Sequence, residues 1–372
     1  MVRFISILKK GLKKPSSRGA SKEVALPPEN SGMLEENPAL AVAPEMPFRR
    51  KTVTNPKSLL ASPSGISDEE CREMYNELYA AAQASLGQGL DRERITQALH
   101  RAVGIFERAL YNPLLLMGYS FSKKSYLPAH IVNDVLLTIG FARSLGYDHA
   151  ATRDIALCAF VHDLGMSSFE GISKKGQQLA QHEIEDVKQH PLRSAELVRP
   201  VFGEKVAAVV LDVHERANGQ GYPKGVPGSG IHLWAKIISV CDTFEALTHP
   251  RIFRPQYSPY EAMKIIIKKK DILFDDVIVR RFIDFLSIYP VGSLVYLNSG
   301  EMALVTGSNP GSPTRPMVRI LVNENLEIDD SGALIDLSAK DFVYISGVVE
   351  MEKEKEVLYF LKPRGQVDVD EA

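Results

Sequence analysis

The chain has 372 residues, of which 45% are hydrophobic and 24% are charged, a composition typical of a soluble globular protein with two or three domains. Its formal net charge of −2 argues against a general nucleic-acid binder, which would usually be strongly basic. Cys71, Cys158 and Cys241 are odd in number and far apart, and the last two stand in apolar runs. We therefore expect buried thiols in a reducing, cytoplasmic protein, not a disulfide framework.

Residues 1–65 are rich in Pro, Ser, Asn and charge and show no sustained period, which predicts a disordered leader. The apolar segment at its start is too short to span a membrane and lacks the order of a signal peptide. Because Lys13 and Lys14 follow it, contact with an anionic membrane surface is the alternative interpretation. No other apolar stretch approaches the roughly 20 residues of a spanning helix, so we expect no transmembrane segment.

A helical pattern begins after Ser67, which we predict to be an N-cap with Glu70 as its capping-box partner. Helices are predicted over residues 68–84 and 91–110. We assign residues 66–112 to an N-terminal helical region, whose input signal the sequence does not indicate.

Residues 113–288 form the central domain, in which helical periodicity dominates and strand-like alternation is nearly absent. This pattern favours an all-α bundle with sites built from side chains on facing helices. The predicted helices span residues 131–145, 150–164, 191–201, 205–212, 233–248, 259–268 and 275–288.

After Gly292 the pattern changes to short strands. Residues 293–297 and 301–305 flank a Gly-containing turn and predict a hairpin, and further strands are predicted over residues 316–322 and 341–345. We assign residues 289–362 to a small β domain and residues 363–372 to a tail. The predicted fold class is mainly α, with a helical bundle preceded by a helical region and followed by a small β domain.

His162 and Asp163 end an apolar helix, where a buried charged pair must be paired or bound to a metal. A His-Asp dipeptide is common, and a helix-end histidine beside a solvated aspartate is the alternative. Asp242 interrupts another apolar run, where an unpaired carboxylate would be costly.

His130, His190 and His214 strengthen the metal interpretation. We expect His130 to open a helix, and His190 precedes a proline that suits a first helical turn. Each could alone be a core histidine bonded to the backbone, but all together with Asp163 and Asp242 this is improbable. Mixed imidazole and carboxylate ligands suit Fe, Mn or Zn better than Mg or Ca. The other histidines are interpreted as surface or local hydrogen-bonding groups: His100, His149, His182, His232 and His249.

These residues and the Gly-rich stretch that follows resemble the HD-GYP family. The HD superfamily pattern of His, His-Asp and a distant Asp is matched by His130, His162, Asp163 and Asp242, and the subfamily's His before Pro by His190. The subfamily signature His-His-Glu-x-x-Asp-Gly-x-Gly-Tyr-Pro is similar to Val213-His214-Glu215-x-x-Asn218-Gly219-x-Gly221-Tyr222-Pro223.

The resemblance implies an all-helical HD-domain bundle that hydrolyses cyclic di-GMP to pGpG, GMP or both. It implies two divalent metal ions, Fe or Mn, with His162 and Asp163 as catalytic residues. Arg251, Arg254 and Lys236 are candidate substrate contacts. The implied metal ligands are His130, His162, Asp163, His190, His214 and Asp242. The signature loop, through which GGDEF-type signalling proteins could bind, comprises Glu215, Gly219, Gly221, Tyr222 and Pro223.

Besides the mild change of the signature Asp to Asn218, which also suits a tight turn, three family positions are altered. Val213 replaces the first histidine of the signature pair, and Tyr126 stands where a glutamate would help to hold a third metal. Met166 stands where the family has a lysine placed to contact substrate phosphate. The alternative hypothesis is therefore a catalytically degenerate protein that acts as a cyclic di-GMP receptor or a protein-interaction module. A third is an HD-type hydrolase of another phosphoester.

Overall fold

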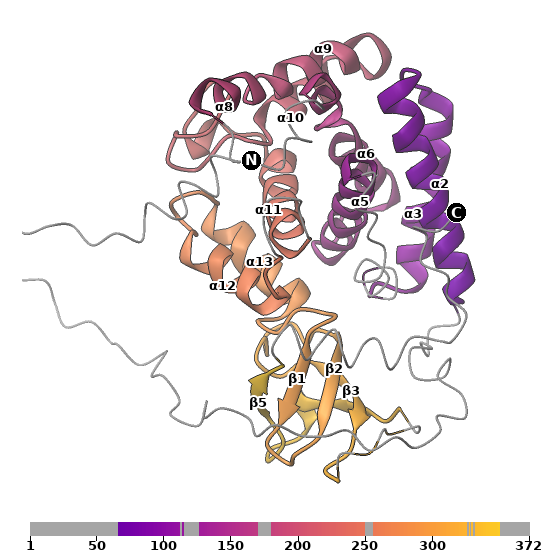
Figure 1. Ribbon diagram of the computed structural model, residues 1–372, viewed down its shortest axis with the longest axis vertical. Helices are drawn as coiled ribbons and strands as arrows, with labels where there is room; N and C mark the ends of the chain where they lie inside the picture. The colour runs from indigo at the N-terminus through magenta and orange to yellow at the C-terminus, as the bar shows by residue number, and fades with distance from the viewer. Residues whose placement is uncertain are drawn as a thin grey trace, which may run out of the picture.

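The computed structural model describes residues 66–111, 114, 126–169, 180–249, 256–325, 327, 329 and 332–349. The predicted leader, the predicted tail and the candidate substrate contacts Arg251 and Arg254 lie outside these residues. Among the described helices, none has the length and apolar character needed to cross a membrane. The helices lie together in the upper part of Figure 1, with the strands below them.

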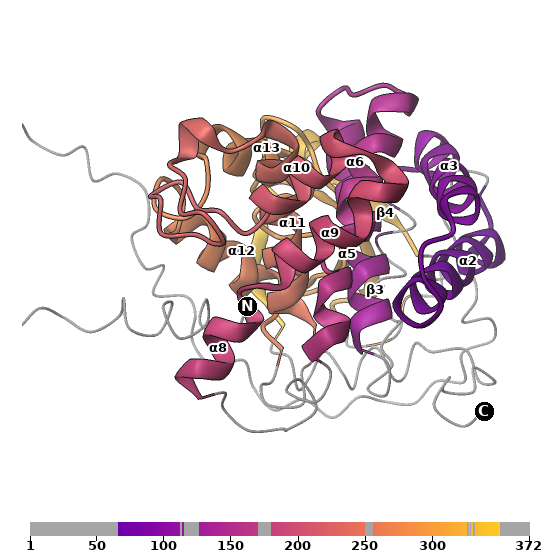
Figure 2. The ribbon, with the colours of Figure 1, turned by 90° about the horizontal axis from the view of Figure 1, so that it is seen from above.

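Helices α2 (Asp68–Gly87) and α3 (Arg92–Arg108) lie side by side along one flank of the bundle, as Figure 2 shows. Ser67 is the N-cap of α2, since its side chain accepts a hydrogen bond from the amide of Glu70 at 3.1 Å. The capping-box role predicted for Glu70 is wrong, because its carboxylate pairs with Arg108 of α3. That ion pair ties the two helices together.

The central bundle is built around two helices that are buried on nearly all sides, α5 and α11. Every residue of α5 from Pro128 to Ala142 is buried, so polar side chains on this helix must find partners inside the protein. The elements of the bundle are α5 (Tyr126–Ser144), α6 (His149–Val161), η2 (Leu164–Phe169), α8 (Gln181–Val187), α9 (His190–Phe202), α10 (Glu204–Asp212), η3 (Gly228–Gly230), α11 (Leu233–Thr248), α12 (Pro259–Lys268) and α13 (Asp276–Leu286).

The predicted bounds of α11 and α12 match the structure, in which Ser258 caps α12 and His232 caps α11. Helix α5 begins at Tyr126, so His130 lies in its second turn and does not open the helix as predicted. The short elements η2 and α8 were not predicted, since neither is long enough to show a helical period.

The C-terminal unit is a five-stranded sheet with the order β4-β3-β2-β1-β5, in which neighbouring strands are antiparallel. The predicted hairpin is confirmed by β1 and β2. The strand predicted over residues 341–345 is wrong except for its last residue, because Phe342 is 88% exposed and pairing begins only at Ile345. Strand β4 was not predicted because its three residues are too few to show alternation. The strands are β1 (Leu294–Leu297), β2 (Met302–Gly307), β3 (Met317–Val322), β4 (Leu334–Asp336) and β5 (Ile345–Val348).

Hydrogen bonds join the sheet to the end of α13. The hydroxyl of Tyr111 lies 2.7 Å from the hydroxyl of Ser308 and donates to the carbonyl of Phe285 at 3.2 Å. Ser287 donates to the carbonyl of Pro313 at 2.6 Å. The fold is therefore mainly α with a small antiparallel sheet, as the sequence predicts.

Candidate metal centre

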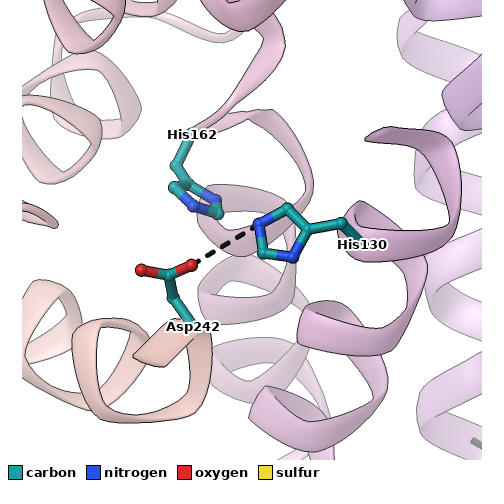
Figure 3. Close-up of side chains that lie close together, drawn as sticks. All are labelled: His130, His162 and Asp242. Atoms are coloured by element: carbon teal, nitrogen blue, oxygen red, sulfur yellow. Dashed lines mark ion pairs between the residues drawn. The ribbon is translucent and has the colours of Figure 1, made fainter. Parts of the chain in front are cut away.

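The six predicted metal ligands come from separate elements and meet inside the bundle. His130 lies on α5, His162 and Asp163 follow α6, and His190 begins α9. His214 follows α10 and Asp242 lies in the middle of α11. Each is at most 2% exposed. Figure 3 shows the side chains of His130, His162 and Asp242 turned toward one another.

The carboxylate of Asp163 lies at the centre of this group. Its Oδ1 is 3.2 Å from Nε2 of His162, 3.1 Å from Nε2 of His190 and 3.2 Å from Nε2 of His214. Its Oδ2 faces the other way, 3.2 Å from Nε2 of His130. Oδ1 therefore faces three imidazoles and Oδ2 faces a fourth, as expected of a carboxylate that bridges two cations.

Asp242 closes the group from α11. Its Oδ1 lies 3.4 Å from Nε2 of His130, the contact drawn in Figure 3, and its Oδ2 lies 3.8 Å from Nδ1 of His214. Two overlapping groups of three residues each bring their ligand atoms within 4.8 Å of one another. One group is His130, His162 and Asp242, and the other is His162, Asp163 and His214.

The hydrogen bonds of the histidines determine which nitrogen is available to a metal. His162 donates from Nδ1 to the carbonyl of Ala159, and His190 donates from Nδ1 to that of Val187, both at 2.7 Å. A proton held on Nδ1 leaves the Nε2 lone pair free for a metal.

Several inward-facing atoms of the group have no hydrogen-bond partner within the described residues. They include Oδ1 of Asp242 and Nε2 of His130, His162 and His190. Buried polar atoms are nearly always paired, so these atoms and their imidazole and carboxylate chemistry fit divalent metal ions.

The pKa shifts of Asp163 and His214 favour the protonation states that metal ligands need, whereas the pKa of His130 is raised in the metal-free group. Burial would raise the pKa of Asp163, but His162 and His190 hold it well below its usual value, so the carboxylate is ionised. Burial lowers the pKa of His214 well below its usual value, so its imidazole is neutral. An ionised carboxylate and a neutral imidazole are the forms that bind metals.

Gly165 allows η2 to approach α9 closely. A Cβ at this position would lie 2.3 Å from the carbonyl oxygen of His190 and 2.8 Å from the amide of Ser194. The amide of Gly165 donates to the hydroxyl of Ser194 at 2.8 Å. This contact sets the distance between Asp163 and His190, since each lies next to it.

The signature loop folds back onto the histidines. The buried carboxylate of Glu215 accepts hydrogen bonds from the amides of Lys224, Gly225 and Val226 at 2.7, 3.0 and 3.1 Å. Gly219 adopts a positive φ of 71°, which favours glycine. The loop is therefore held by the carboxylate of Glu215 and, through the amides of Ala217 and Asn218, by the carbonyls of Leu273 and Ile272.

Tyr222 contacts two of the candidate ligands. Its ring stacks on that of His214, with centroids 5.1 Å apart and planes at 11°, and meets His190 edge-on at 5.9 Å. Pro223 follows through a cis peptide bond. The structure thus places the loop beside the histidines.

The three altered family positions have distinct surroundings. Val213 is fully buried and belongs to the hydrophobic core of the bundle. The ring of Tyr126 stacks on that of His130, with centroids 5.5 Å apart and planes at 10°. Met166 is half-buried, and its amide donates to the carbonyl of Asp163 at 2.9 Å.

Lys236, a candidate substrate contact, has a partner within the protein. Its Nζ donates to Oδ2 of Asp275 at 2.9 Å, and Asp275 is the N-cap of α13. Its role toward a substrate stays a prediction.

Four polar residues around the ligands were not predicted from the sequence. Asp134 and Glu245 are buried carboxylates, with Asp134 four residues after His130 and Glu245 three after Asp242. Residues three or four apart share a helix face, so the spacing from His130 and Asp242 could have identified Asp134 and Glu245 as neighbours of the ligands. The other two are Asn133, which is buried on α5, and His249, which is 5% exposed and bonds to Asn133.

Comparison with known families gives two matches. The family described as "HD domain" matches residues 128–278, which hold all six candidate ligands. The family described as "KOW domain associated with HD domain" matches residues 294–356, which hold the sheet.

Individual relatives agree with these matches. The chain is 29% identical over 331 residues to a cyclic di-GMP phosphodiesterase of Pseudomonas aeruginosa, covering 86% of this chain and 78% of the relative. It is 23% identical over 207 residues to the cyclic di-GMP phosphodiesterase PdeB of Borreliella burgdorferi, covering 55% of each. It is 34% identical over 155 residues to the 3'3'-cGAMP-specific phosphodiesterase 1 of Vibrio cholerae, covering 41% of this chain and 36% of that relative.

Proposed function

The chain belongs to the HD-GYP family, and we propose that it is a metal-dependent phosphodiesterase that hydrolyses cyclic di-GMP to pGpG, GMP or both. One observation carries the proposal. The Asp163 carboxylate lies within 3.1–3.2 Å of the Nε2 atoms of His130, His162, His190 and His214. Four imidazoles around one buried carboxylate fit a cation centre better than a set of hydrogen bonds, because Nε2 of His130, His162 and His190 is left without a hydrogen-bond partner.

We propose two metal ions, with Fe or Mn as the metal. His130, His162, Asp163 and Asp242 would hold one ion, and Asp163, His190 and His214 the other. Buried carboxylates are costly unless their charge is balanced, and Asp163, Asp242 and Glu245 are each at most 2% exposed. When bound, a pair of such ions activates water for attack and neutralises the charge that develops on a phosphodiester.

The chain's own residues would position the metal ligands and exclude water from the centre. Asp163 would hold the two halves of the centre together, since each of its oxygens faces a different set of histidines. Tyr222 would fix the ring of His214 and exclude water from that side. Arg251 and Arg254 stay candidate phosphate contacts, because a guanidinium suits phosphate oxygens.

The altered positions support a second candidate, a protein that binds cyclic di-GMP without hydrolysing it. Val213 is part of the hydrophobic core, so this position offers no ligand atom. Tyr126 covers one face of the His130 ring with its own ring. With Met166 in place of the family lysine, one charge-assisted hydrogen bond to substrate phosphate is lost. This would raise the activation free energy by about 1.5–3 kcal/mol and lower turnover by one to two decades.

The rim of the signature loop is open to a partner. Asn218, Gln220, Lys224 and Gly225 are exposed, whereas Glu215 and Tyr222 hold the loop from inside. We propose this rim as the contact for GGDEF-type signalling proteins. A cytoplasmic location agrees with the free thiols of Cys71, Cys158 and Cys241.

Anaerobic incubation of the full chain with cyclic di-GMP and Fe(II) or Mn(II), followed by separation of the nucleotides, tests the proposal. We expect pGpG or GMP from the wild type and neither from the double variant His162→Ala/Asp163→Ala. A parallel reaction with 3'3'-cGAMP tests the substrate class. Unchanged cyclic di-GMP in the presence of bound metal would favour the receptor.

A further inference from the structure

Glu245 is a buried carboxylate on α11 that faces a candidate metal ligand on α5. It is 1% exposed, and its Oε2 pairs with Nδ1 of His130. It belongs to neither set of ligand atoms that could hold a metal ion. Its contact is with the far side of the His130 ring, opposite the Nε2 that faces Asp163 and Asp242.

We propose that Glu245 is a positioning residue that fixes the orientation and tautomer of His130 for metal binding. By accepting the Nδ1 proton, its carboxylate leaves Nε2 as the ligand atom and makes the imidazole more basic. This inference rests on the metal-dependent function proposed above. It adds a residue that does not itself touch a metal.

The contrast with the other histidines supports this role. His162 and His190 each donate from Nδ1 to a backbone carbonyl three residues earlier, which the local helix geometry provides. His130 lies inside a helix, and its Nδ1 partner is a side chain from another helix. The Nδ1 hydrogen bond of His130 therefore depends on the Glu245 side chain, and a carboxylate is a stronger acceptor than a carbonyl.

Glu245 is itself held in place by two further donors. Asn133 donates from Nδ2 to Oε1 of Glu245 at 3.3 Å. His249, the C-cap of α11, donates from Nδ1 to the backbone carbonyl of Glu245 at 3.0 Å, and the same nitrogen lies 3.0 Å from Oε1. Nδ2 of Asn133 also lies 3.1 Å from Nε2 of His249. With Oε1 held by Asn133 and the backbone carbonyl held by His249, Oε2 stays directed at His130.

Mn(II) binding to the full chain tests the role through a readout other than catalysis. Affinity and stoichiometry are measured for the wild type, Glu245→Gln, His130→Ala and the double variant. Loss of such a supporting partner typically weakens metal binding about 10-fold to 100-fold, and we expect this for Glu245→Gln. In the His130→Ala background, Glu245→Gln should cause no further loss, because the carboxylate acts through His130.

Glu107→Gln is the matched control. Glu107 also pairs with Nδ1 of a histidine, His149, at 3.2 Å, but this pair lies between α3 and the start of α6. The same chemical change there should leave Mn(II) affinity unchanged. Thermal unfolding of the metal-free proteins shows whether each variant folds. If Glu245→Gln does not fold, Asn133→Ala removes one donor to Glu245 and should weaken Mn(II) binding only when His130 is present.

Native Mn(II) affinity in a folded Glu245→Gln protein would overturn the proposal, as would additive losses in the double variant. A wild-type chain that binds no Mn(II) or Fe(II) would instead remove the proposed metal-dependent function, and this inference with it.

Discussion

The ring of Tyr222 lies parallel to the ring of His214, with centroids 5.1 Å apart and planes at 11°. The same tyrosine donates its backbone amide to the carbonyl of His214 at 3.2 Å. The Gly-Tyr-Pro segment is therefore part of the wall of the candidate metal centre, because it contacts both the backbone and the ring of one candidate ligand.

Replacing Tyr222 by Ala or by Phe should distinguish the contribution of its ring to metal binding from that of its hydroxyl. An aromatic pair contributes about 0.5–1.5 kcal/mol beyond its buried area, so Tyr222→Ala should weaken Mn(II) binding about twofold to tenfold. Tyr222→Phe keeps the stacked ring and should bind like the wild type. Isothermal titration with Mn(II) gives both values, and equal losses in the two variants would contradict the stacking role.

Gly221 should tolerate no side chain. A Cβ there would lie 2.3 Å from Cα of Glu215 and 2.4 Å from the amide of Arg216, and these backbone atoms cannot move aside cheaply. Gly221→Ala should lower the free energy of unfolding by about 1–3 kcal/mol or more. Gly104→Ala is the control, since nothing lies within 4 Å of its Cβ, and in helix α3 it should stabilise by about 0.5–1 kcal/mol. Urea unfolding measures both, and similar values for the two would contradict the packing argument.

Metal removal should destabilise the folded chain. A ligand that binds only the native state at 100 times its Kd adds about 2.7 kcal/mol, so Mn(II) should raise Tm and a chelator should reverse the rise. The double variant His162→Ala/Asp163→Ala should show no such rise. Differential scanning calorimetry with and without metal measures the effect, and a metal-independent Tm in the wild type would argue against the centre.

Much of the helical fold could be predicted because amphipathic periodicity and caps are local properties. Ser258 and Pro259 mark the start of α12, and the observed helix begins there. Strand β4 could not be predicted in this way, because its pairing with β3 decides it, and the seven residues of α8 are too few to show a helical period.

The candidate ligands were identified as residue types in an order, and the fold places them around Asp163. The supporting residues were missed because their role depends on contacts between α5 and α11. His249 was interpreted as a surface or local hydrogen-bonding residue; it is buried, and its Nδ1 makes a local hydrogen bond to the carbonyl of Glu245. Only the packed structure shows that Glu245 reaches His130.

Two of the altered family positions, Met166 and Val213, should respond differently to restoration. Met166 is half-buried one turn after Asp163, so Met166→Lys can extend its amine toward substrate phosphate. A charge-assisted hydrogen bond gained there would raise turnover of cyclic di-GMP by about one to two decades. Steady-state kinetics tests this, and unchanged kcat/KM in a folded variant would contradict it.

Val213→His should destabilise the chain and add no ligand. Val213 is 0% exposed and packs in the hydrophobic core, where a buried imidazole without a partner costs about 1–3 kcal/mol. We expect a lower Tm and unchanged metal stoichiometry, measured by elemental analysis. An additional bound ion would show that this position can still face the centre.

Lys236→Met should distinguish a structural lysine from a substrate contact. The Nζ of Lys236 is held by Asp275 at 2.9 Å, and Oδ1 of Asp275 accepts from the amides of Val277 and Ile278 at the start of α13. The ion pair therefore joins α11 to the N-terminus of α13. In it, the Asp275 carboxylate neutralises the ammonium charge that a substrate phosphate would otherwise bind. Partly exposed ion pairs contribute about 0.2–1 kcal/mol, so Lys236→Met and Asp275→Asn should each lower stability by that amount and leave the KM for cyclic di-GMP unchanged. A tenfold rise in KM for Lys236→Met with native stability would instead place this lysine on the substrate, because a lost phosphate contact acts on binding and leaves the fold intact.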